Sequence, residues 1–599
     1  MISFIIIIII ILIFFFFNRA VIQRVFIFGS ANKTSKLYLN GWETNNNTSL
    51  LMMFRARYGQ KHGNYAVLIS SRSASASART NAHAASTREF ENKSPSIVQK
   101  STTSLDEEGN KARVVIFVKA GKRSFLKYPK SLPAYDVSNR KAGAFIDYEE
   151  AFGHIKRRLK WSNDGFQAFV CAHGDDDEDV LARAETKEFC QKADCFVIVA
   201  DEGECDDQTA QKIEKLVSVI PTGLCVGTTE SEKLKSLERL QFMPMKTQQR
   251  PNDFFELPFE TRRMKDEKKF LQMKKLFERK NHLDLLFMIL VLIDSCEIPG
   301  LNVPEVAINQ EINLENIWCI ASNCGSKLLD CYKNPQCMKS LNCIDACGMN
   351  DQVCTYTCLR SYQNREFEYV ARCMLHSHNC LGNDAKRPEF PIVKPMTKFR
   401  GEPLTHETAE KIMQGWLGTT TKDGKTNEYS WLAVAGQNPA YDHFPAQYQI
   451  WYNGKARNSF WYNPVFKVNT LDGKSVWRRS DYRCKREKDP GTFTFTFMDN
   501  GVTSKEFWRI VDAADDLSWA LYYYAGAAKS AGQMYVGAVL ATPDGLWPPI
   551  SEMPRVEQAL WEGCGCKMWE MMEVDNRPEV IANAPLQPLH DVVLKPSLI

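Results

Sequence analysis

The sequence predicts a multidomain protein in which an N-terminal α/β domain precedes a small disulfide-rich α-helical domain and an antiparallel β-barrel. Three observations predict it: short apolar runs ended by glycine, ten cysteines between Cys319 and Cys380, and period-two alternation of aromatic residues in the last third. The 599 residues are enough for several domains. The net charge of +4 is too small for a nucleic-acid footprint, so we expect no nucleic-acid partner.

Residues 1–90 are predicted to be a targeting or low-complexity region. Phe4–Phe17 is an unbroken apolar run, short for a membrane span; it fits a signal-peptide core or a low-complexity extension. Met52–Arg88 contains six basic residues, no Asp or Glu, and a Ser/Ala-rich end. That composition is typical of a transit peptide and predicts a plastid or mitochondrial precursor.

Residues 112–247 are predicted to form the α/β domain. The runs RVVIFVKAG, FQAFVCAHG and CFVIVADEG are typical of buried parallel strands, and Asp206 or Asp207 could cap the helix that follows the third. The acidic run Asp175–Asp179 suggests either a cation site or, as we prefer, a solvated loop. No glycine-rich phosphate loop follows any of these strands, so the sequence assigns this domain no chemistry.

Residues 248–317 are predicted to be a charged helical linker with an apolar run, Leu285–Ile293. Nine residues are too few to span a bilayer. We expect a buried helix turn or strand there, in preference to a signal for a second membrane crossing.

Residues 318–381 are predicted to be a disulfide domain and not a metal site. Structural zinc sites favour C-x2-C pairs, and none occurs here. Disulfides require an oxidising compartment. Cysteines four apart share a helix face, so two antiparallel helices would nest their pairs, although spacing alone does not fix the connectivity. The expected bridges are Cys319–Cys337, Cys324–Cys331, Cys343–Cys358, Cys347–Cys354 and Cys373–Cys380.

Residues 428–550 are predicted to form a closed barrel of about eight strands, followed by a C-terminal helix and tail over 551–599. In GTFTFTFMDNG the three phenylalanines alternate with threonines, and Asn453-Gly454, Asp472-Gly473 and Asn500-Gly501 are hairpin signals. A barrel of this size holds side chains or one small ligand. Both alternatives stay open: a cavity for an apolar ligand with polar ends, or an aromatic-filled core.

The cysteine ladder and the barrel resemble violaxanthin de-epoxidase and, more closely, the violaxanthin de-epoxidase-related proteins. The resemblance covers roughly Trp318–Asn576 and is carried by C-x4-C-x6-C-x5-C, SWLAVAGQNPAYDHFPAQ, NPVFKVNTLDG, EFWRIV, YYYAG and GAVLATPDG. It implies a lipocalin-like barrel, nested disulfides and a chloroplast, thylakoid-associated location. It also implies reduction of a xanthophyll epoxide with ascorbate as co-substrate and without a metal, and possible contact with thylakoid membrane lipid.

The resemblance implies roles for five residues. Glu506 stands where the catalytic carboxyl belongs, and the expected substrate-binding residues are Asp442, Gln447, Trp508 and Tyr524. Without the resemblance, a glutamate beside a hairpin would be read as solvent-facing, and an aspartate after Asn-Pro as a turn former.

Several positions depart from the enzyme pattern. Pro445 replaces a second inner acid, Ala541 a tyrosine, and Gln449 and Tyr452 two histidines. We therefore weigh an oxidoreductase against a non-catalytic carrier of a carotenoid or other apolar ligand. A third alternative is a regulatory protein whose α/β domain is the sensor.

Overall fold

The computed structural model describes residues 111–599 except 136–141, 175–179, 201–205, 228–261, 307–313, 349, 421–423 and 457–458. It also describes the backbone of five strands between residues 24 and 70. The apolar run 4–17, the Ser/Ala-rich part of the expected transit peptide and the acidic run 175–179 lie outside the described residues.

The N-terminal strands form a separate antiparallel sheet of order β1-β5-β4-β2, with β3 paired to β4. Their bounds are β1 Arg24–Ile27, β2 Lys36–Leu39, β3 Glu43–Thr44, β4 Ser49–Tyr58 and β5 Lys61–Ser70.

The α/β domain contains a parallel sheet of order β11-β10-β6-β9, as the three apolar runs predict. Asp206 caps α4 by accepting a hydrogen bond from Thr209 N at 2.6 Å. A short antiparallel pair, β7 and β8, follows β6. The bounds are β6 Ala112–Lys119, β7 Arg123–Lys127, β8 Phe145–Asp147, α2 Tyr148–Ser162, β9 Phe166–His173, η1 Val180–Ala182, α3 Ala184–Lys192, β10 Cys195–Val199, α4 Asp207–Val217 and β11 Thr222–Val226.

The apolar run Leu285–Ile293 lies in a buried helix, which confirms the preferred reading. It belongs to α7 (His282–Ser295), which follows α6 (Arg262–Glu278). The α7 side chains share one core cluster with α2 and with the outward-facing barrel residues Tyr523 and Leu540. No helix in the described part of the chain combines the length and apolarity that a membrane crossing requires.

The cysteine-rich domain is helical and has five disulfides. Its elements are α8 Leu314–Lys333, α9 Pro335–Asp345, α10 Gln352–Ser361, α11 Arg365–Ala371 and the π-helix η3 Arg372–Ser377. Two expected bridges, Cys343–Cys358 and Cys347–Cys354, are present and join α9 and the turn after it to α10. The other three disulfides of the structure are Cys319–Cys380, Cys324–Cys373 and Cys331–Cys337.

The expected bridges Cys319–Cys337, Cys324–Cys331 and Cys373–Cys380 are therefore wrong. Cys319, Cys324 and Cys331 all lie on the single helix α8. Residues seven apart on a helix are separated by about 10 Å along its axis, beyond the Cα separation that a disulfide tolerates. The first two cysteines of α8 therefore pair with the end of the domain, across 61 and 49 residues.

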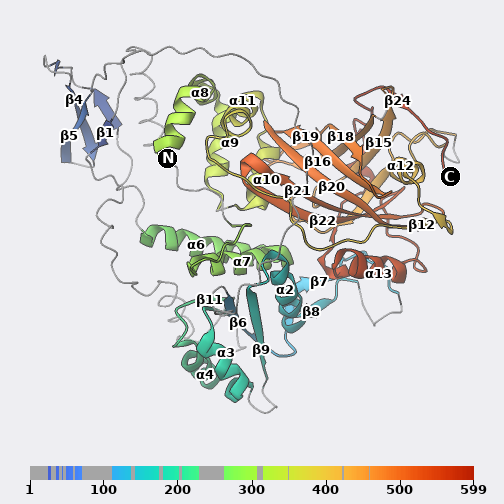
Figure 1. Ribbon diagram of the computed structural model, residues 1–599, viewed down its shortest axis with the longest axis horizontal. Helices are drawn as coiled ribbons and strands as arrows, with labels where there is room; N and C mark the ends of the chain where they lie inside the picture. Colours follow the sequence, from blue (N-terminus) through green and yellow to red (C-terminus); the bar gives the residue numbers. More distant parts are fainter. Residues whose placement is uncertain are drawn as a thin grey trace, which may run out of the picture. The chain divides into compact units, whose positions relative to one another are not determined.

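The barrel is closed and antiparallel, with eight strands, as predicted. Figure 1 shows several of these strands, including β16, β18 and β19, side by side. The strands pair in the circular order β14-β15-β16-β18-β19-β20-β21-β22 and back to β14. All three phenylalanines of GTFTFTFMDNG lie in the interior cluster. The strands are β14 Trp431–Gly436, β15 Tyr448–Gly454, β16 Phe460–Asn469, β18 Tyr482–Arg486, β19 Thr492–Asp499, β20 Val502–Ala513, β21 Ala520–Ala528 and β22 Gln533–Thr542.

Short elements surround the barrel. Strands β17, β23 and β24 extend the sheet beside β16, β14 and β15, and β12 pairs with β13. The remaining bounds are β12 Lys398–Phe399, β13 Glu402–Pro403, α12 His406–Gln414, β17 Ser475–Arg479, η4 Lys529–Ala531, α13 Met553–Cys564, η5 Met568–Glu570, β23 Met572–Glu573, α14 Pro578–Ile581 and β24 Val592–Val593.

Candidate functional site

Glu506 faces the barrel interior and not solvent. It lies on β20, where Glu506, Trp508 and Ile510 alternate with outward-facing residues and are at most 7 % exposed. Trp508 Nε1 and Tyr535 OH each donate a hydrogen bond to its carboxylate at 2.7 Å. Burial raises the pKa of Glu506 to about 7, although these two hydrogen bonds act to lower it.

Asp442 is a second buried carboxyl, contributed by the loop between β14 and β15. It accepts a hydrogen bond from Asn438 N at 2.7 Å and from Tyr524 OH at 3.0 Å to each oxygen. Burial raises the pKa of Asp442 to about 7 against the effect of these donors. The site therefore contains two carboxyls that keep their protons close to neutral pH.

Glycines opposite two tyrosines give the rings room to lie across the sheet. Tyr524 on β21 is paired with Gly537 on β22, and Gly526 with Tyr535. A Cβ atom on Gly537 would be 2.3 Å from the Tyr524 ring, and one on Gly526 would be 2.6 Å from the Tyr535 ring. These glycines therefore let each tyrosine hydroxyl reach its carboxyl.

Four of the five predicted site residues are joined by direct contacts. Trp508 bonds Glu506, Tyr524 bonds Asp442, and the rings of Trp508 and Tyr524 stack with centroids 5.2 Å apart. Gln447 is also buried, but its amide donates to the Phe444 carbonyl at 2.9 Å. The structure thus places Gln447 in the loop that carries Asp442, without a bond to either carboxyl.

Sequence reasoning missed the residues at the mouth of the barrel. Tyr441 lies between Tyr535 and Tyr356, with ring centroids 4.7 and 4.5 Å away. Tyr356 belongs to α10, so the cysteine-rich domain contributes an aromatic ring to this end of the barrel. The rings of Tyr356, Tyr441 and Tyr535 thus form a continuous row from α10 to Tyr535, which bonds Glu506.

A buried ion pair joins α10 to the same end of the barrel. Arg360 is fully buried, and its guanidinium pairs with Asp499 at the end of β19 and bonds Tyr356 OH. Tyr356 and Arg360 are four residues apart and lie on the helix face away from Cys354 and Cys358. The four-residue spacing of Tyr356 and Arg360 is the feature of the sequence that could have placed them on one helix face.

Aromatic rings fill the interior beyond the carboxyls. Trp451 stacks on Tyr462 at 3.8 Å and Tyr482 on Phe497 at 3.7 Å. Within the described part of the chain, the buried Tyr522 OH and Trp451 Nε1 have no hydrogen-bond partner. They are donors that a polar group of a ligand could satisfy.

The cysteine ladder, the closed barrel and its buried carboxyls lie within one matched segment. Residues 316–576 match the family model described as the VDE lipocalin domain. These residues form a VDE lipocalin domain. No curated protein matches the chain.

Solved structures similar to the chain include two apocrustacyanins. Lobster apocrustacyanin A1 is 11 % identical, with 33 % of this chain and 96 % of that chain covered and a TM-score of 0.20. Apocrustacyanin C1 is 11 % identical, with coverages of 32 % and 93 % and a TM-score of 0.19.

Proposed function

We propose that the VDE lipocalin domain is a plastid oxidoreductase that reduces the epoxide of a xanthophyll, with ascorbate as reductant and Glu506 as proton donor. The observation that carries the proposal is the burial of Glu506 among aromatic rings, with a pKa of about 7. A carboxyl in such surroundings stays protonated at pH values where an exposed glutamate is ionised.

The proposed chemistry uses that proton. Glu506 protonates the epoxide oxygen as a carbon–oxygen bond breaks, which removes the cost of an alkoxide leaving group in an apolar site. Ascorbate supplies two electrons and two protons in total and becomes dehydroascorbate. The epoxide becomes a carbon–carbon double bond, the oxygen leaves as water, and the net proton balance returns Glu506 to its acid form.

Asp442 has a different proposed role. It is held by Tyr524, and the Tyr524 ring stacks on Trp508 beside Glu506. We assign Asp442, Trp508 and Tyr524 to substrate orientation, with Gln447 supporting the loop that holds Asp442. Both carboxyls are protonated below about pH 7, so the proposal requires activity that rises as the pH falls.

The proposed location is the chloroplast, in association with the thylakoid. The five disulfides support an oxidising compartment, and the acid-free basic segment before residue 90 supports organelle import. An acidic compartment would keep Glu506 in the proton-donating form.

A carrier of a carotenoid or another apolar ligand is the second candidate function. It is favoured by Ala541, which is fully buried in the interior cluster where the related enzymes have a tyrosine, and by Pro445 in place of an inner acid. A barrel with these losses could retain the pigment without converting it.

The test incubates the purified, oxidised full chain with violaxanthin, lipid and ascorbate at about pH 5, and separates the pigments by chromatography. We expect de-epoxidised product with wild type and with Glu402→Gln, which changes an exposed carboxyl. We expect no product with Glu506→Gln. Pigment that stays bound and unconverted by wild type supports the carrier, and neither binding nor product overturns both candidates.

A further inference from the structure

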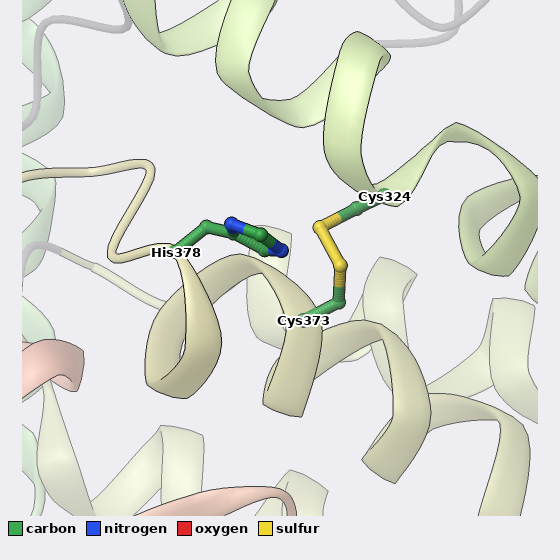
Figure 2. A group of neighbouring side chains, drawn as sticks. All are labelled: Cys324, Cys373 and His378. Carbon is green, nitrogen blue, oxygen red and sulfur yellow. A yellow bond between two sulfur atoms is a disulfide. The ribbon is translucent and has the colours of Figure 1, made fainter. Parts of the chain in front are cut away.

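In the described part of the chain, the groups of side chains of metal-ligand type contain cysteines that are already bonded in disulfides. Cys324 is bonded to Cys373 beside His378 (Figure 2), and the sulfurs of the other group belong to the two bridges of α10. These sulfurs are therefore not free ligands in the oxidised protein. The buried charged side chains between the α/β domain and the barrel are of a different kind, and their contacts lead to Asp442.

These charged side chains join the α/β domain to the segment that follows the barrel. Arg158 of α2 and Glu570 of η5 are both buried, and Arg158 Nη2 lies 2.7 Å from Glu570 Oε2. His154 of α2 contacts the same carboxylate, and Nε2 of His282 on α7 is 3.5 Å from Glu570 Oε2. Glu570 is thus held by α2 and α7, which both lie outside the VDE lipocalin domain.

These contacts keep Glu570 ionised. Burial acts to raise the pKa of Glu570, but the Arg158 guanidinium outweighs burial and holds the pKa well below its ordinary value. Burial lowers the pKa of His282 to about 3, so this imidazole carries no charge near neutral pH. Glu570 is therefore a charged acceptor, and a charged acceptor makes stronger hydrogen bonds than a neutral one.

The α/β domain also holds the strand that follows Glu570. Glu573 of β23 accepts hydrogen bonds from the backbone N atoms of Lys130 and Ser131, at 3.0 and 2.6 Å. Strand β23 is paired with the end of β14, the strand before the loop that carries Asp442. The α/β domain thus fixes a segment that is hydrogen-bonded to the start of this loop.

Gln437 connects Glu570 to the Asp442 loop. It follows β14, is buried, and donates a hydrogen bond from Nε2 to Glu570 Oε2 at 2.8 Å. The next residue, Asn438, donates its backbone N–H to Asp442 at 2.7 Å. A Cβ atom on Gly436 would lie 2.3 Å from the Asp442 Cβ, so the loop folds back directly onto the end of β14. A shift of Gln437 would therefore move the N–H donor relative to the carboxyl.

We propose that the α/β domain positions Asp442 through Glu570 and Gln437. Arg158 fixes the Glu570 carboxylate, Glu570 fixes the Gln437 amide, and the backbone after Gln437 presents its N–H to Asp442. Arg158, Glu570 and Gln437 are positioning residues, because their side chains act on the carboxyl through the backbone of the loop. The consequence for substrate orientation rests on the proposed function, whereas the positioning of the carboxyl does not.

Stability alone is a weak reason for a buried ion pair such as Arg158–Glu570. The cost of removing two charges from water offsets much of their attraction, so apolar side chains of similar volume often give the same stability. Hydrogen bonds to a fixed carboxylate, in contrast, are directional and define where the Gln437 amide lies. This difference allows an experiment to separate positioning from stability.

The proton affinity of Asp442 reports the position of the loop. Burial raises the pKa of Asp442 to about 7, and the backbone N–H groups of Asn438 and Gln437 act to lower it. Loss of such a donor therefore raises the pKa further. The titratable side chains that also interact with Asp442 from neighbouring strands include Glu506, Tyr524 and Tyr462. Wild type and the variants below share these side chains.

The experiment follows the Asp442 carboxyl band by infrared difference spectroscopy of the oxidised full chain between about pH 5 and about pH 9, with Asp442→Asn to assign the band. Gln437→Met removes the bond to Glu570 and leaves the Arg158–Glu570 pair complete. We expect the midpoint pH of the Asp442 band to rise by about 1, because the Asn438 N–H moves away from the carboxylate.

The matched control is Gln414→Met. Gln414 on α12 is buried like Gln437, and its Nε2 donates to Lys595 O at 3.3 Å. The control thus removes a buried glutamine amide and its hydrogen bond elsewhere in the chain. It should leave the midpoint of the Asp442 band unchanged.

A second variant, Arg158→Met with Glu570→Met, replaces the whole ion pair by apolar side chains, which proteins tolerate better than the loss of one partner. It should raise the midpoint as Gln437→Met does, and adding Gln437→Met to it should have no further effect. The measurement needs no substrate, so a failure of the proposed function does not change its outcome. An Asp442 band that titrates as in wild type in either variant, or that shifts equally in Gln414→Met, overturns the proposal.

Discussion

Glu506→Gln is expected to change how the stability of the protein depends on pH. The ordinary pKa of the glutamate is 4.5, and burial raises it to about 7 in the folded protein. Between these values the folded state binds more protons than the unfolded state, so the free energy of unfolding falls as the pH rises. One pKa unit corresponds to about 1.4 kcal/mol, so the shift from 4.5 to about 7 changes the free energy of unfolding by about 3 kcal/mol.

Glutamine cannot ionise, and the variant lacks this contribution. Relative to wild type, the free energy of unfolding of Glu506→Gln should therefore rise by about 3 kcal/mol between pH 4 and pH 8. Asp442 keeps its own pH dependence in both proteins, because its pKa is also raised, from 3.8 to about 7. The difference between the two proteins isolates the Glu506 contribution.

The assay is urea unfolding of the oxidised full chain at several pH values between 4 and 8, followed by tryptophan fluorescence, because Trp508 bonds Glu506 directly. Glu402→Gln, which changes an exposed residue of β13, should track wild type at every pH. A difference between Glu506→Gln and wild type that stays constant from pH 4 to pH 8 would refute the assignment of a buried, protonated carboxyl.

Three further predictions follow from the site. Tyr524→Phe removes a donor that lowers the pKa of Asp442, so the Asp442 carboxyl should stay protonated to higher pH, as infrared difference spectra against Asp442→Asn can show. Arg360→Met leaves Asp499 without its partner and should lower the free energy of unfolding by about 3–5 kcal/mol, measured by urea unfolding. The control Arg365→Met, on the exposed face of α11, should lower it little. Equal losses of stability in the two variants would count against a buried ion pair. Gly537→Ala puts a Cβ 2.3 Å from the Tyr524 ring and should lower the free energy of unfolding by about 1–3 kcal/mol. In a protein that already carries Tyr524→Ala, the same glycine change should be nearly neutral. Additive losses of stability in the double variant would contradict the contact.

Residue alternation predicted the barrel and the orientation of β19 within it. The three phenylalanines of β19 were expected on one face and lie in the interior. Local spacing also identified Cys343–Cys358 and Cys347–Cys354, because Cys343 lies in α9, Cys347 follows its end, and both partners lie in the next helix, α10. The parallel strands of the α/β domain were predicted from their apolar runs. These features depend on periods of two or four residues, which a sequence displays directly.

The carboxyl site required more than local pattern. Resemblance pointed to Glu506 and Asp442, but spacing alone favoured a solvent-facing glutamate and a turn aspartate. Their burial follows from barrel closure, which places β20, β21, β22 and the loop after β14 around one volume. Tyr535 was missed because its significance depends on the strand opposite, where Gly526 makes room for its ring.

The sequence by itself thus predicted the parallel strands of the α/β domain, the barrel region and a helical domain stapled by disulfides. Only the tertiary structure decided that Cys324 pairs with Cys373, that His378 lies beside them, and that Arg360 of α10 meets Asp499 at the barrel mouth. The physical reason is distance along the chain. Partners separated by 49 or 139 residues are selected by how whole elements pack, and no short-range period in the sequence records that choice.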